Sequence, residues 1–321
     1  MTHSEVNDVK PTSLKHIIGQ TAVKETVNVA LDAAHMDARR FDHAMLVGPP
    51  GCGKTSVSHI ISEEMAAPCI EVLGQSIANF AELNAVLLSV KEDKTVIFID
   101  EAALLDKTLQ VALYMALDQR KIVVSGGKTG GSPISIPLLD FTLLLATTHE
   151  AELLQPLRDR MRLVLRFQFY SEDELVELVR QRCRALAWTV EDGVLPEIAQ
   201  RSRGTPRIAL RLLQAARRCA RAEGENTITL YHLHRACSLD QIDPLGLGPT
   251  EQAYLRLLVD GPRRLNVLAS MLGLPPKTIS EVTESYLQRI GLVCKDDQGR
   301  RCLTAAGMDH CQSLVKQPSD S

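Results

Sequence analysis

The sequence predicts an α/β protein with a parallel sheet built around a phosphate-binding loop, a small all-helical domain and a C-terminal winged helix. Three observations lead to this prediction. An apolar run is followed by the complete pattern Gly48-x-x-x-x-Gly53-Lys54-Thr55, and a later apolar run ends in Asp100 and Glu101. Beyond Tyr170 the apolar spacing is helical only, and residues 250–304 have the pattern of three helices and a hairpin.

Length and composition narrow the class of protein. The chain has 321 residues, which suggests two or three domains, and it is 45% hydrophobic and 23% charged, as soluble globular proteins are. Its net charge of -3 means that any nucleic-acid contact must come from local patches or from assembly. The eight cysteines include no Cys-x-x-Cys pair, so neither a zinc site nor a disulfide framework is indicated. No apolar run reaches the roughly 18 residues of a membrane span and no signal-peptide pattern is present, so we expect a cytoplasmic protein outside the membrane.

Residues 1–35 precede the phosphate loop. Residues 1–12 are polar, and we expect a mobile tail there. The apolar spacing predicts a helix over 22–35, and Gly19 changes the chain direction just before it. Because segment 14–20 lies just ahead of the loop, it can form a wall of an adenine pocket.

The phosphate-loop pattern occurs in the context that it requires, between a strand at 45–47 and a helix at 57–65. Its glycines let the backbone turn N–H groups toward phosphate oxygens, and the helix adds its positive end. Lys54 can reach the β- and γ-phosphates of ATP, and the Thr55 hydroxyl can ligate Mg²⁺. The alternative is a plain glycine turn between a strand and a helix. Within the loop, Cys52 is interpreted as a small filler residue rather than as a redox-sensitive group. The predicted nucleotide-binding residues of this segment are Gly48, Gly51, Cys52, Gly53, Lys54, Thr55 and Ser56.

Two carboxylates end the next buried strand. After a strand at 69–73 and a helix at 79–90, an apolar run that begins at Thr95 ends in Asp100 and Glu101. We expect Asp100 to hold Mg²⁺, directly or through water, and Glu101 to orient the attacking water. The alternative is a strand that ends in a solvated acidic cap.

A helix at 107–117 is followed by a hairpin and another buried strand. The hairpin, residues 121–137, has a glycine-rich tip and is either a surface turn or an arm that docks a partner. The strand at 141–148 ends in two hydroxyls. Thr148 at this end would lie beside the γ-phosphate, or else simply cap the strand.

Three arginines precede the last core strand, at 163–167. They are Arg158, Arg160 and Arg162. Such a group is often a solvated face. In a ring-shaped ATPase, one of them can reach the γ-phosphate of the neighbouring subunit and stabilise the charge of the transition state.

Helical periodicity dominates from Ser171 to Asp240. Ser171 and Glu174 form a capping-box pattern at the start of the first helix. Pro206 suits the first turn of the third helix, and Arg207 in that turn can project toward a bound nucleotide. The predicted helices are 172–186, 193–200, 206–223 and 229–238.

A linker at 243–249 separates this region from the winged helix. The predicted elements are helices at 250–260, 265–272 and 276–288, and a strand-turn-strand at 291–304. The wing tip carries Arg300 and Arg301, which are suited to phosphate or groove contacts. Residues 244–321 hold nine basic and eight acidic side chains, so only the wing argues for DNA, and a protein-docking module is the alternative. Residues 316–321 are expected to be a frayed tail.

Taken together, the motifs resemble the RuvB family of AAA+ Holliday-junction branch-migration motors over residues 12–305. The resemblance rests on Ile18-Gly-Gln, Gly-Pro-Pro-Gly-Cys-Gly-Lys-Thr, Phe-Ile-Asp-Glu, Ala-Thr-Thr, Pro-Leu-Arg-Asp-Arg, Phe-Tyr and Ser-Arg-Gly-Thr-Pro-Arg-Ile-Ala. It implies an AAA+ core at 1–169, a helical lid at 170–243 and a DNA-binding winged helix at 244–321. It also implies a homo-hexameric ring around double-stranded DNA at four-way junctions, working with a RuvA-type junction-binding partner.

The resemblance assigns roles residue by residue. Lys54, Thr55, Asp100 and Glu101 keep the Walker roles described above. Thr148 matches sensor 1, Arg160 the arginine finger, and Arg207 sensor 2. The other assignments are Ile18, Tyr170 and Pro206 in the adenine pocket, the 121–137 hairpin as the partner-docking arm, and Arg300 as a wing arginine that contacts DNA.

The sequence also departs from the family pattern. The family has Ile-His-Arg after the Asp-Glu pair, and here Ala102, Ala103 and Leu104 follow. His149 replaces an arginine after the threonine pair, Met161-Arg162 replaces Phe-Gly after the finger, and the hairpin has diverged. Since these positions lie near the γ-phosphate and the subunit interface, we expect the coupling of ATP state to ring motion to differ.

The function favoured by the sequence is an ATP-driven DNA translocase for branch migration in recombination and repair. A second hypothesis is a nucleotide-switched DNA-binding or assembly protein without motor activity, which the lost His-Arg and the altered hairpin favour. A clamp-loader-type AAA+ protein is a third, but that class ends in a collar instead of a winged helix.

Overall fold

The computed structural model describes residues 5–6, 9–126 and 131–316. They form two compact units, the first up to Leu186 together with Gly204–Ile208, and the second comprising Ala187–Arg203 and Ala209 onward. The first unit contains α1 (Thr21–Met36), β1 (Ala44–Val47), α2 (Lys54–Glu64), β2 (Cys69–Leu73), α3 (Phe80–Leu88), β3 (Thr95–Asp100), α4 (Lys107–Gln119), β4 (Lys121–Gly126), β5 (Gly131–Pro137), β6 (Phe141–Thr147), α5 (Gln155–Arg158), β7 (Leu163–Arg166) and α6 (Glu172–Ala185), with single 3-10 turns at Leu14–His16, Gly74–Ser76, Ala102–Leu104 and Glu150–Glu152.

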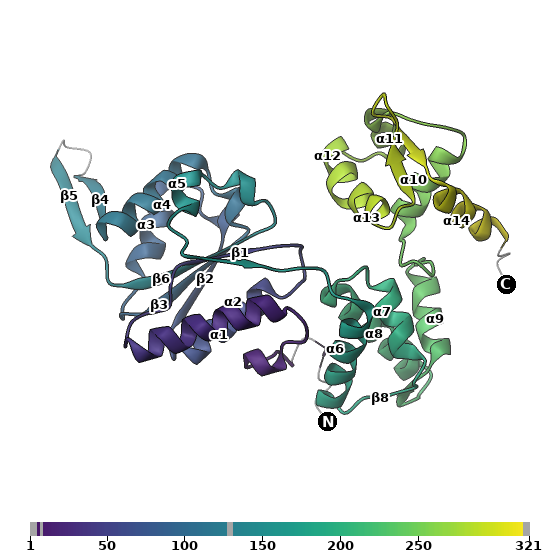
Figure 1. The fold of residues 1–321 in the computed structure, drawn as a ribbon, viewed down its shortest axis with the longest axis horizontal. Coiled ribbons are helices and arrows are strands. Elements are labelled where there is room, and N and C mark those ends of the chain that lie inside the picture. Colours follow the sequence, from purple (N-terminus) through teal and green to yellow (C-terminus); the bar gives the residue numbers. More distant parts are fainter. Residues whose placement is uncertain (1–4, 7–8, 127–130, 317–321) are drawn as a thin grey trace. The chain divides into compact units, whose positions relative to one another are not determined.

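A five-stranded parallel sheet organises the first unit. The strand order is β2-β3-β6-β1-β7, and every residue of β6 is buried, as its continuous apolar run requires. Helices α1 and α2 cover one face of the sheet, and α3, α4 and α5 cover the other (Figure 1). Val47 at the end of β1 pairs with Thr147 at the end of β6, and β3 lies on the other side of β6. Parallel strands end at one edge, so the loops after β1, β3 and β6 meet there.

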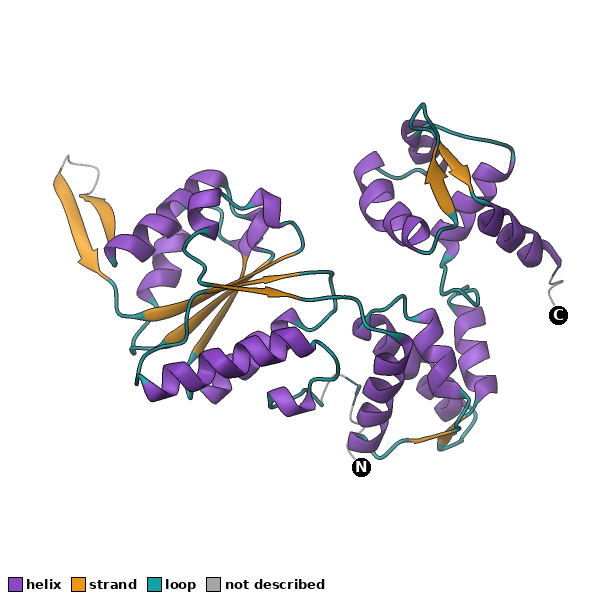
Figure 2. Ribbon diagram, in the orientation of Figure 1, coloured by secondary structure: helices purple, strands orange, loops and turns teal. Residues whose placement is uncertain are grey.

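The second unit contains α7 (Val194–Arg201), most of α8 (Pro206–Ala222), α9 (Leu230–Leu239) and the winged helix. Figure 2 shows that helices dominate it and that its strands are short. The remaining elements are β8 (Thr189–Val190), β9 (Thr227–Ile228), α10 (Pro249–Val259), α11 (Leu265–Leu272), α12 (Pro276–Thr278), a π-helix (Ile279–Thr283), α13 (Glu284–Arg289), β10 (Val293–Lys295), β11 (Arg301–Leu303) and α14 (Ala305–Lys316).

Three predictions for this region need correction. The segment predicted to be only helical also holds the parallel pair β8–β9, two residues long in each strand and therefore below the length at which a period is recognisable. The third helix of the winged helix is interrupted by the π-helix. Helix α14 was not predicted, because Gly307 and several polar residues conceal its apolar face.

The linker after the lid is a packed turn rather than a free connection. Asp243 accepts hydrogen bonds from the amides of Leu245 and Leu247 (2.9 and 2.8 Å) and pairs with His310 of α14 (2.8 Å). A Cβ added to Gly246 would lie 2.2 Å from the carbonyl oxygen of Arg201, so only glycine fits this contact. Within the second unit, lid and winged helix therefore share a buried seam.

The hairpin follows expectation, whereas the N-terminal segment departs from it at Val6. The hairpin forms as β4 and β5 with a bulge between Val124 and Gly126, and the predicted tip at 127–130 lies outside the described residues. In the expected mobile tail, Val6 is buried and its carbonyl accepts a 2.6 Å hydrogen bond from Arg182, so that point of the tail is anchored. No helix in the described part of the chain is long and apolar enough to cross a bilayer.

His43 makes the first unit sensitive to acid. The amide of Leu143 donates a 2.9 Å hydrogen bond to Nδ1 of His43, and burial, helped by nearby Arg40, lowers the pKa of the ring from 6.5 to about 3. The unfolded chain therefore binds a proton between these values that the folded chain does not, and stability must fall as the pH falls through this window.

We expect the free energy of unfolding to decrease by up to roughly 1.4 kcal/mol per pH unit from this residue alone, down to about pH 3. Urea unfolding of the full chain and of His43→Gln at about pH 6 and about pH 4 measures it. The glutamine variant should lose less stability on acidification than the parent. Equal losses in the two proteins would contradict the assignment.

Candidate active site

The phosphate loop has the backbone shape that its glycines permit. Gly48, Gly51 and Gly53 all have positive φ, at 152°, 74° and 103°. A Cβ at Gly48 would lie 2.5 Å from the carbonyl oxygen of Phe167, so β7 packs directly against the loop. Gly53 is the N-cap of α2, which begins at Lys54. Cys52 is fully buried, as expected for a filler residue, and Ser56 lies half-buried in the first turn.

Lys54 is held inside this loop. Its Nζ donates hydrogen bonds to the carbonyls of Gly48 (2.8 Å) and Pro49 (2.9 Å), and the residue is 8% exposed. Burial lowers the pKa of its ammonium group, and the negative charge of Asp100 partly opposes that shift. The ammonium is thus already aimed into the concavity where phosphate oxygens would lie.

Thr55 and Asp100 converge from α2 and β3. The Thr55 hydroxyl lies 3.4 Å from Oδ2 of Asp100. A hydroxyl and a carboxylate at this distance are the hard oxygen donors that Mg²⁺ takes in phosphoryl-transfer sites, so the residues present fit that ion. The other carboxylate oxygen of Asp100 accepts the Glu101 amide at 2.9 Å, which fixes the orientation of the group.

Glu101 follows in a strained conformation. Its φ is +52°, in the left-handed region that costs energy for a residue with a side chain, and the carboxylate is exposed. A Cβ at Gly74 would lie 2.5 Å from the Glu101 carbonyl oxygen. Gly74, which no sequence signal pointed to, therefore allows the turn after β2 to support the end of β3.

The threonine pair ends β6 between β3 and β1. Thr147 is buried, and its hydroxyl accepts the amide of His149 at 2.9 Å. Thr148 is half-buried, with its hydroxyl 2.8 Å from Nδ1 of His149. Thr148 thus lies at the strand edge that carries the phosphate loop and Asp100, and its partner is the residue that departs from the family pattern.

The start of α8 packs against the phosphate loop at Gly51. A Cβ at Gly51 would lie 2.8 Å from Cβ of Arg207 and 2.9 Å from a Thr205 methyl. Arg207 is exposed, and its positive charge contributes to lowering the pKa of Lys54. Pro206 is buried at the first position of the helix. The structure therefore brings Arg207 to the phosphate loop, while the contact made by Thr205 was missed.

The predicted adenine-pocket residues gather near the same loop. Tyr170 is 8% exposed, and its hydroxyl would lie 3.8 Å from a Cβ at Gly53. Burial raises the pKa of Tyr170 to about 12, and a hydrogen bond with Gln20 partly offsets that effect. Gln20 also bonds the carbonyl (2.8 Å) and amide (3.1 Å) of Gln168. Ile18 is half-buried two residues earlier.

Arg160 lies apart from these groups. Its guanidinium binds both carboxylate oxygens of Asp118, one at 2.7 Å, and lies 4.7 Å from the centre of the Tyr114 ring. Neither partner belongs to the nucleotide motifs. Asp118 was not predicted, and no local pattern marks it, because it lies 42 residues from Arg160.

The two wing arginines differ in environment. Arg300 is 39% exposed in its side chain and pairs with Asp296 at the tip (2.7 Å). Arg301 is 12% exposed and binds both carboxylate oxygens of Glu284, at 2.8 and 3.2 Å. Glu284 is 1% exposed and also accepts the hydroxyl of Tyr254 at 2.7 Å. Arg301 thus serves the core of the winged helix.

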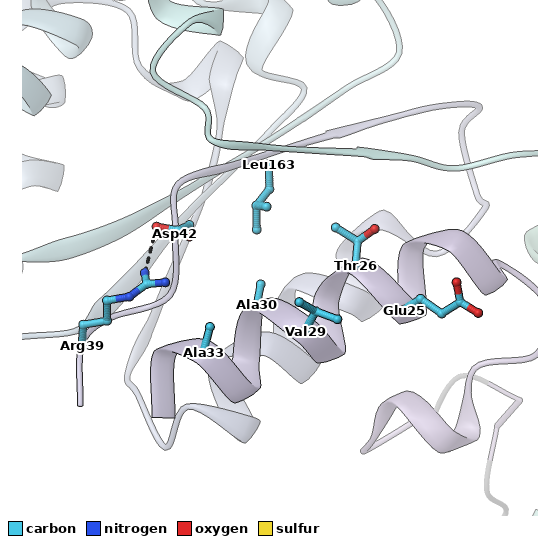
Figure 3. Close-up of a pocket in the computed structure, with 8 residues that line it drawn as sticks. All are labelled: Glu25, Thr26, Val29, Ala30, Ala33, Arg39, Asp42 and Leu163. Carbon is cyan, nitrogen blue, oxygen red and sulfur yellow. Dashed lines mark hydrogen bonds and ion pairs between the residues drawn. The ribbon is translucent and has the colours of Figure 1, made fainter. Parts of the chain in front are cut away.

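A separate hollow of about 480 Å³ lies between α1 and the start of β7. Figure 3 shows Val29, Ala30 and Ala33 of α1 on the side facing Leu163. The ion pair between Arg39 and Asp42 closes one end (2.9 Å). None of the predicted nucleotide-binding residues lines this hollow, so it is distinct from the phosphate site.

Comparison with known families accounts for this arrangement. Residues 9–167 match the model described as "Holliday junction DNA helicase RuvB P-loop domain". Residues 170–243 match the RuvB AAA lid domain, and residues 244–312 the RuvB C-terminal winged helix domain. The chain belongs to the RuvB family. With its phosphate loop and carboxylate pair intact, this RuvB-family chain is an AAA+ ATPase of the branch-migration type.

Individual relatives agree over nearly the full length. A Holliday junction branch migration complex subunit, RuvB 2 of Synechococcus sp. (strain JA-3-3Ab), is 36% identical over 99% of this chain and 86% of its own. The RuvB subunit of Kosmotoga olearia is 36% identical over 91% and 86%. The solved Thermotoga maritima RuvB branch migration motor superposes with a TM-score of 0.82 at 33% identity, covering 94% of this chain and 98% of that one.

Proposed function

We propose that this RuvB-family ATPase moves double-stranded DNA through four-way junctions as a homo-hexameric ring, with a RuvA-type partner. The observation that carries the proposal is the meeting of Lys54, Thr55, Asp100 and Arg207 around one phosphate loop, in a chain that continues into a winged helix. We place the functional boundaries near residues 170 and 244, where the lid and the winged helix begin.

Hydrolysis in this site would be a matter of positioning and charge. Lys54 exchanges the carbonyls of Gly48 and Pro49 for phosphate oxygens, at little cost because the ammonium is already desolvated. Glu101 orients the attacking water, and Thr148 holds the γ-phosphate side. Mg²⁺, when held by Thr55 and Asp100, neutralises charge on the phosphates. Arg207 reports phosphate occupancy to the lid helix that it begins.

In the proposed ring, each nucleotide site would be completed by a residue of the neighbouring subunit. Arg160 lies in the turn after α5, and its guanidinium pairs with Asp118 and lies over the ring of Tyr114. A guanidinium kept in place this way loses little side-chain entropy when it engages a partner's γ-phosphate. We therefore propose that Arg160 acts in trans.

The partner-docking surface is proposed at the hairpin. Val123 of β4 and Ile134 of β5 are 57% and 59% exposed, whereas Val124 and Ile136 pack on the core of the first unit. Because Ile134 pairs with Val124 in the register, Val123 and Ile134 lie on opposite faces of the hairpin. Exposed apolar side chains on a projecting hairpin suit a protein partner. The hairpin departs from the family pattern, and we propose that the partner it docks is the host's own junction-binding protein.

The decisive experiment is the steady-state ATPase rate without DNA, with linear duplex and with a four-way junction, each with and without that partner. We expect the highest rate with junction and partner together, and none in Lys54→Ala. In Val123→Asp/Ile134→Asp, the increment due to the partner should disappear. A slow ATPase rate that changes with neither DNA nor partner would overturn the proposal of a motor.

That outcome would favour a nucleotide-switched assembly protein. One observation supports this second candidate: His149, in place of the family arginine, bonds its own neighbour Thr148. A switch would still show ATP-dependent change in oligomeric state by light scattering, with binding to DNA but no displacement of junction arms.

A further inference from the structure

The wing carries two thiols directly opposite each other. Cys294 on β10 and Cys302 on β11 are partners in the strand register, and their sulfur atoms lie 3.3 Å apart. Both are free, Cys294 is exposed and Cys302 is half-buried, whereas most of the other cysteines are buried. Among the described residues, this pair alone combines sulfur–sulfur contact with access to solvent.

The strand register places the two cysteines at a Cα separation that disulfides also show. On either side of the pair, the Thr304 amide bonds the Leu292 carbonyl (3.1 Å) and the Asp296 amide bonds the Arg300 carbonyl (2.9 Å). Hydrogen-bonded pairs alternate along an antiparallel ladder, so Cys294 and Cys302 form such a pair, with Cα atoms about 5.5 Å apart. That value lies within the range of about 4.4–6.8 Å found for disulfides. The Cβ atoms of a hydrogen-bonded pair lie about 5.5 Å apart, beyond the roughly 3.5–4.5 Å of a disulfide, so the two strands must also move closer locally as the bond closes.

We propose that Cys294 and Cys302 are a thiol–disulfide exchange site that ties the two strands of the wing together when it meets a low-molecular-weight disulfide. The Cys294 thiolate attacks one sulfur of the reagent and releases one reagent thiolate. The Cys302 thiolate then attacks Sγ of Cys294 and releases the second. The protein loses two protons and two electrons, and the reagent disulfide is reduced to two thiols.

Exposure assigns the two roles. Cys294 faces solvent and can meet the reagent, whereas Cys302 is half-buried with its sulfur 3.6 Å from the Cys294 carbonyl oxygen. The contact with the Cys294 sulfur, with burial, raises the pKa of Cys302, which makes its thiolate less populated. Cys294 is therefore the attacking thiol and Cys302 the resolving one.

The bond would act on the tip of the wing. The β10–β11 ladder has three pairs, and the cysteines form the middle one, between the tip with Arg300 and the base anchored by Leu303 in the core of the winged helix. A two-stranded ribbon this short is held weakly by itself. Closing the disulfide would fix the tip to the body of the domain. The oxidation state of the two cysteines would then control the mobility of the wing tip independently of bound nucleotide.

The test uses the full-length chain with oxidised glutathione, followed by N-ethylmaleimide and trypsin. Trypsin cuts after Lys295, Arg300 and Arg301, so peptides 290–295 and 302–316 separate unless a disulfide joins them. Mass spectrometry should find these two peptides linked and free of glutathione, and dithiothreitol should release them. Stable glutathione on both cysteines, or two unreacted thiols, would overturn the proposal.

Single variants check the order of attack. Cys302→Ser should accumulate glutathione on Cys294, because the resolving thiol is gone, and Cys294→Ser should react more slowly at Cys302. The matched control Cys69→Ser, at a half-buried cysteine of another domain, should cross-link like the parent. Circular dichroism confirms that each variant is folded. If Cys302→Ser carries no glutathione on Cys294, the mechanism is wrong.

Discussion

Arg160→Ala should lower the ATPase rate by roughly 10³–10⁵-fold while leaving ATP binding nearly unchanged. The physical reason is that a guanidinium supplied by a neighbour stabilises charge that develops only in the transition state. Steady-state turnover and the affinity for a fluorescent ATP analogue separate the two effects. Arg162→Ala is the matched control, since its side chain is 70% exposed and pairs with Asp42 (3.1 Å).

Mixing variants tests whether Arg160 acts in trans. Glu101→Gln should also be inactive if Glu101 orients the attacking water as we propose. In a mixed ring, however, an Arg160→Ala subunit still supplies Glu101 to its own site, and a Glu101→Gln neighbour still supplies Arg160. We expect mixing to restore part of the activity that each variant lacks alone. Failure to restore any, with mixed rings shown to form, would mean that Arg160 does not serve a neighbouring site.

The second large effect concerns Arg301, whose removal should destabilise the winged helix by about 3–5 kcal/mol. Glu284 is 1% exposed, and without Arg301 its carboxylate would keep only the Tyr254 hydroxyl as a partner among the described contacts. Thermal or urea unfolding of Arg301→Ala measures the loss. Adding Glu284→Gln to that variant should recover part of it, because no buried charge then remains; an unchanged loss would contradict this explanation.

The adjacent residue should behave in the opposite way. Arg300 is partly exposed and its partner Asp296 is at the tip, so Arg300→Ala should change stability by less than about 0.5 kcal/mol. If Arg300 contacts a DNA phosphate, the variant should bind DNA more weakly. The slope of log affinity against log salt concentration should then decrease in magnitude by about 1. Affinities measured at several salt concentrations decide this. Equal DNA affinity in the variant and the parent would contradict a contact between Arg300 and DNA.

Local patterns accounted for much of the nucleotide site. The phosphate loop and the Asp100-Glu101 pair are contiguous stretches, and their glycines and apolar runs dictate a strand, a tight loop and a helix over a few residues. The fold class followed because such strands must bury both faces. Capping chemistry likewise predicted the start of α6, where Ser171 accepts the amide of Glu174 at 3.2 Å.

Other features escaped prediction because they depend on residues far apart in the chain. Gly74 beneath Glu101, Thr205 against Gly51, and Asp118 beside Arg160 are contacts that only the packed sheet and helices create. Each involves an ordinary residue type with no neighbouring signal. Composition could not reveal them, since a glycine or an aspartate at these positions looks like any surface turn.

The sequence by itself determined that this chain binds a nucleotide, because a phosphate loop is made from consecutive residues whose backbone conformation their own side chains dictate. Only the tertiary structure decided which of two adjacent arginines is available to a partner. Arg301 is the first residue of β11 and lies over the buried Glu284, whereas Arg300 belongs to the turn before that strand and pairs with Asp296 at the partly exposed tip.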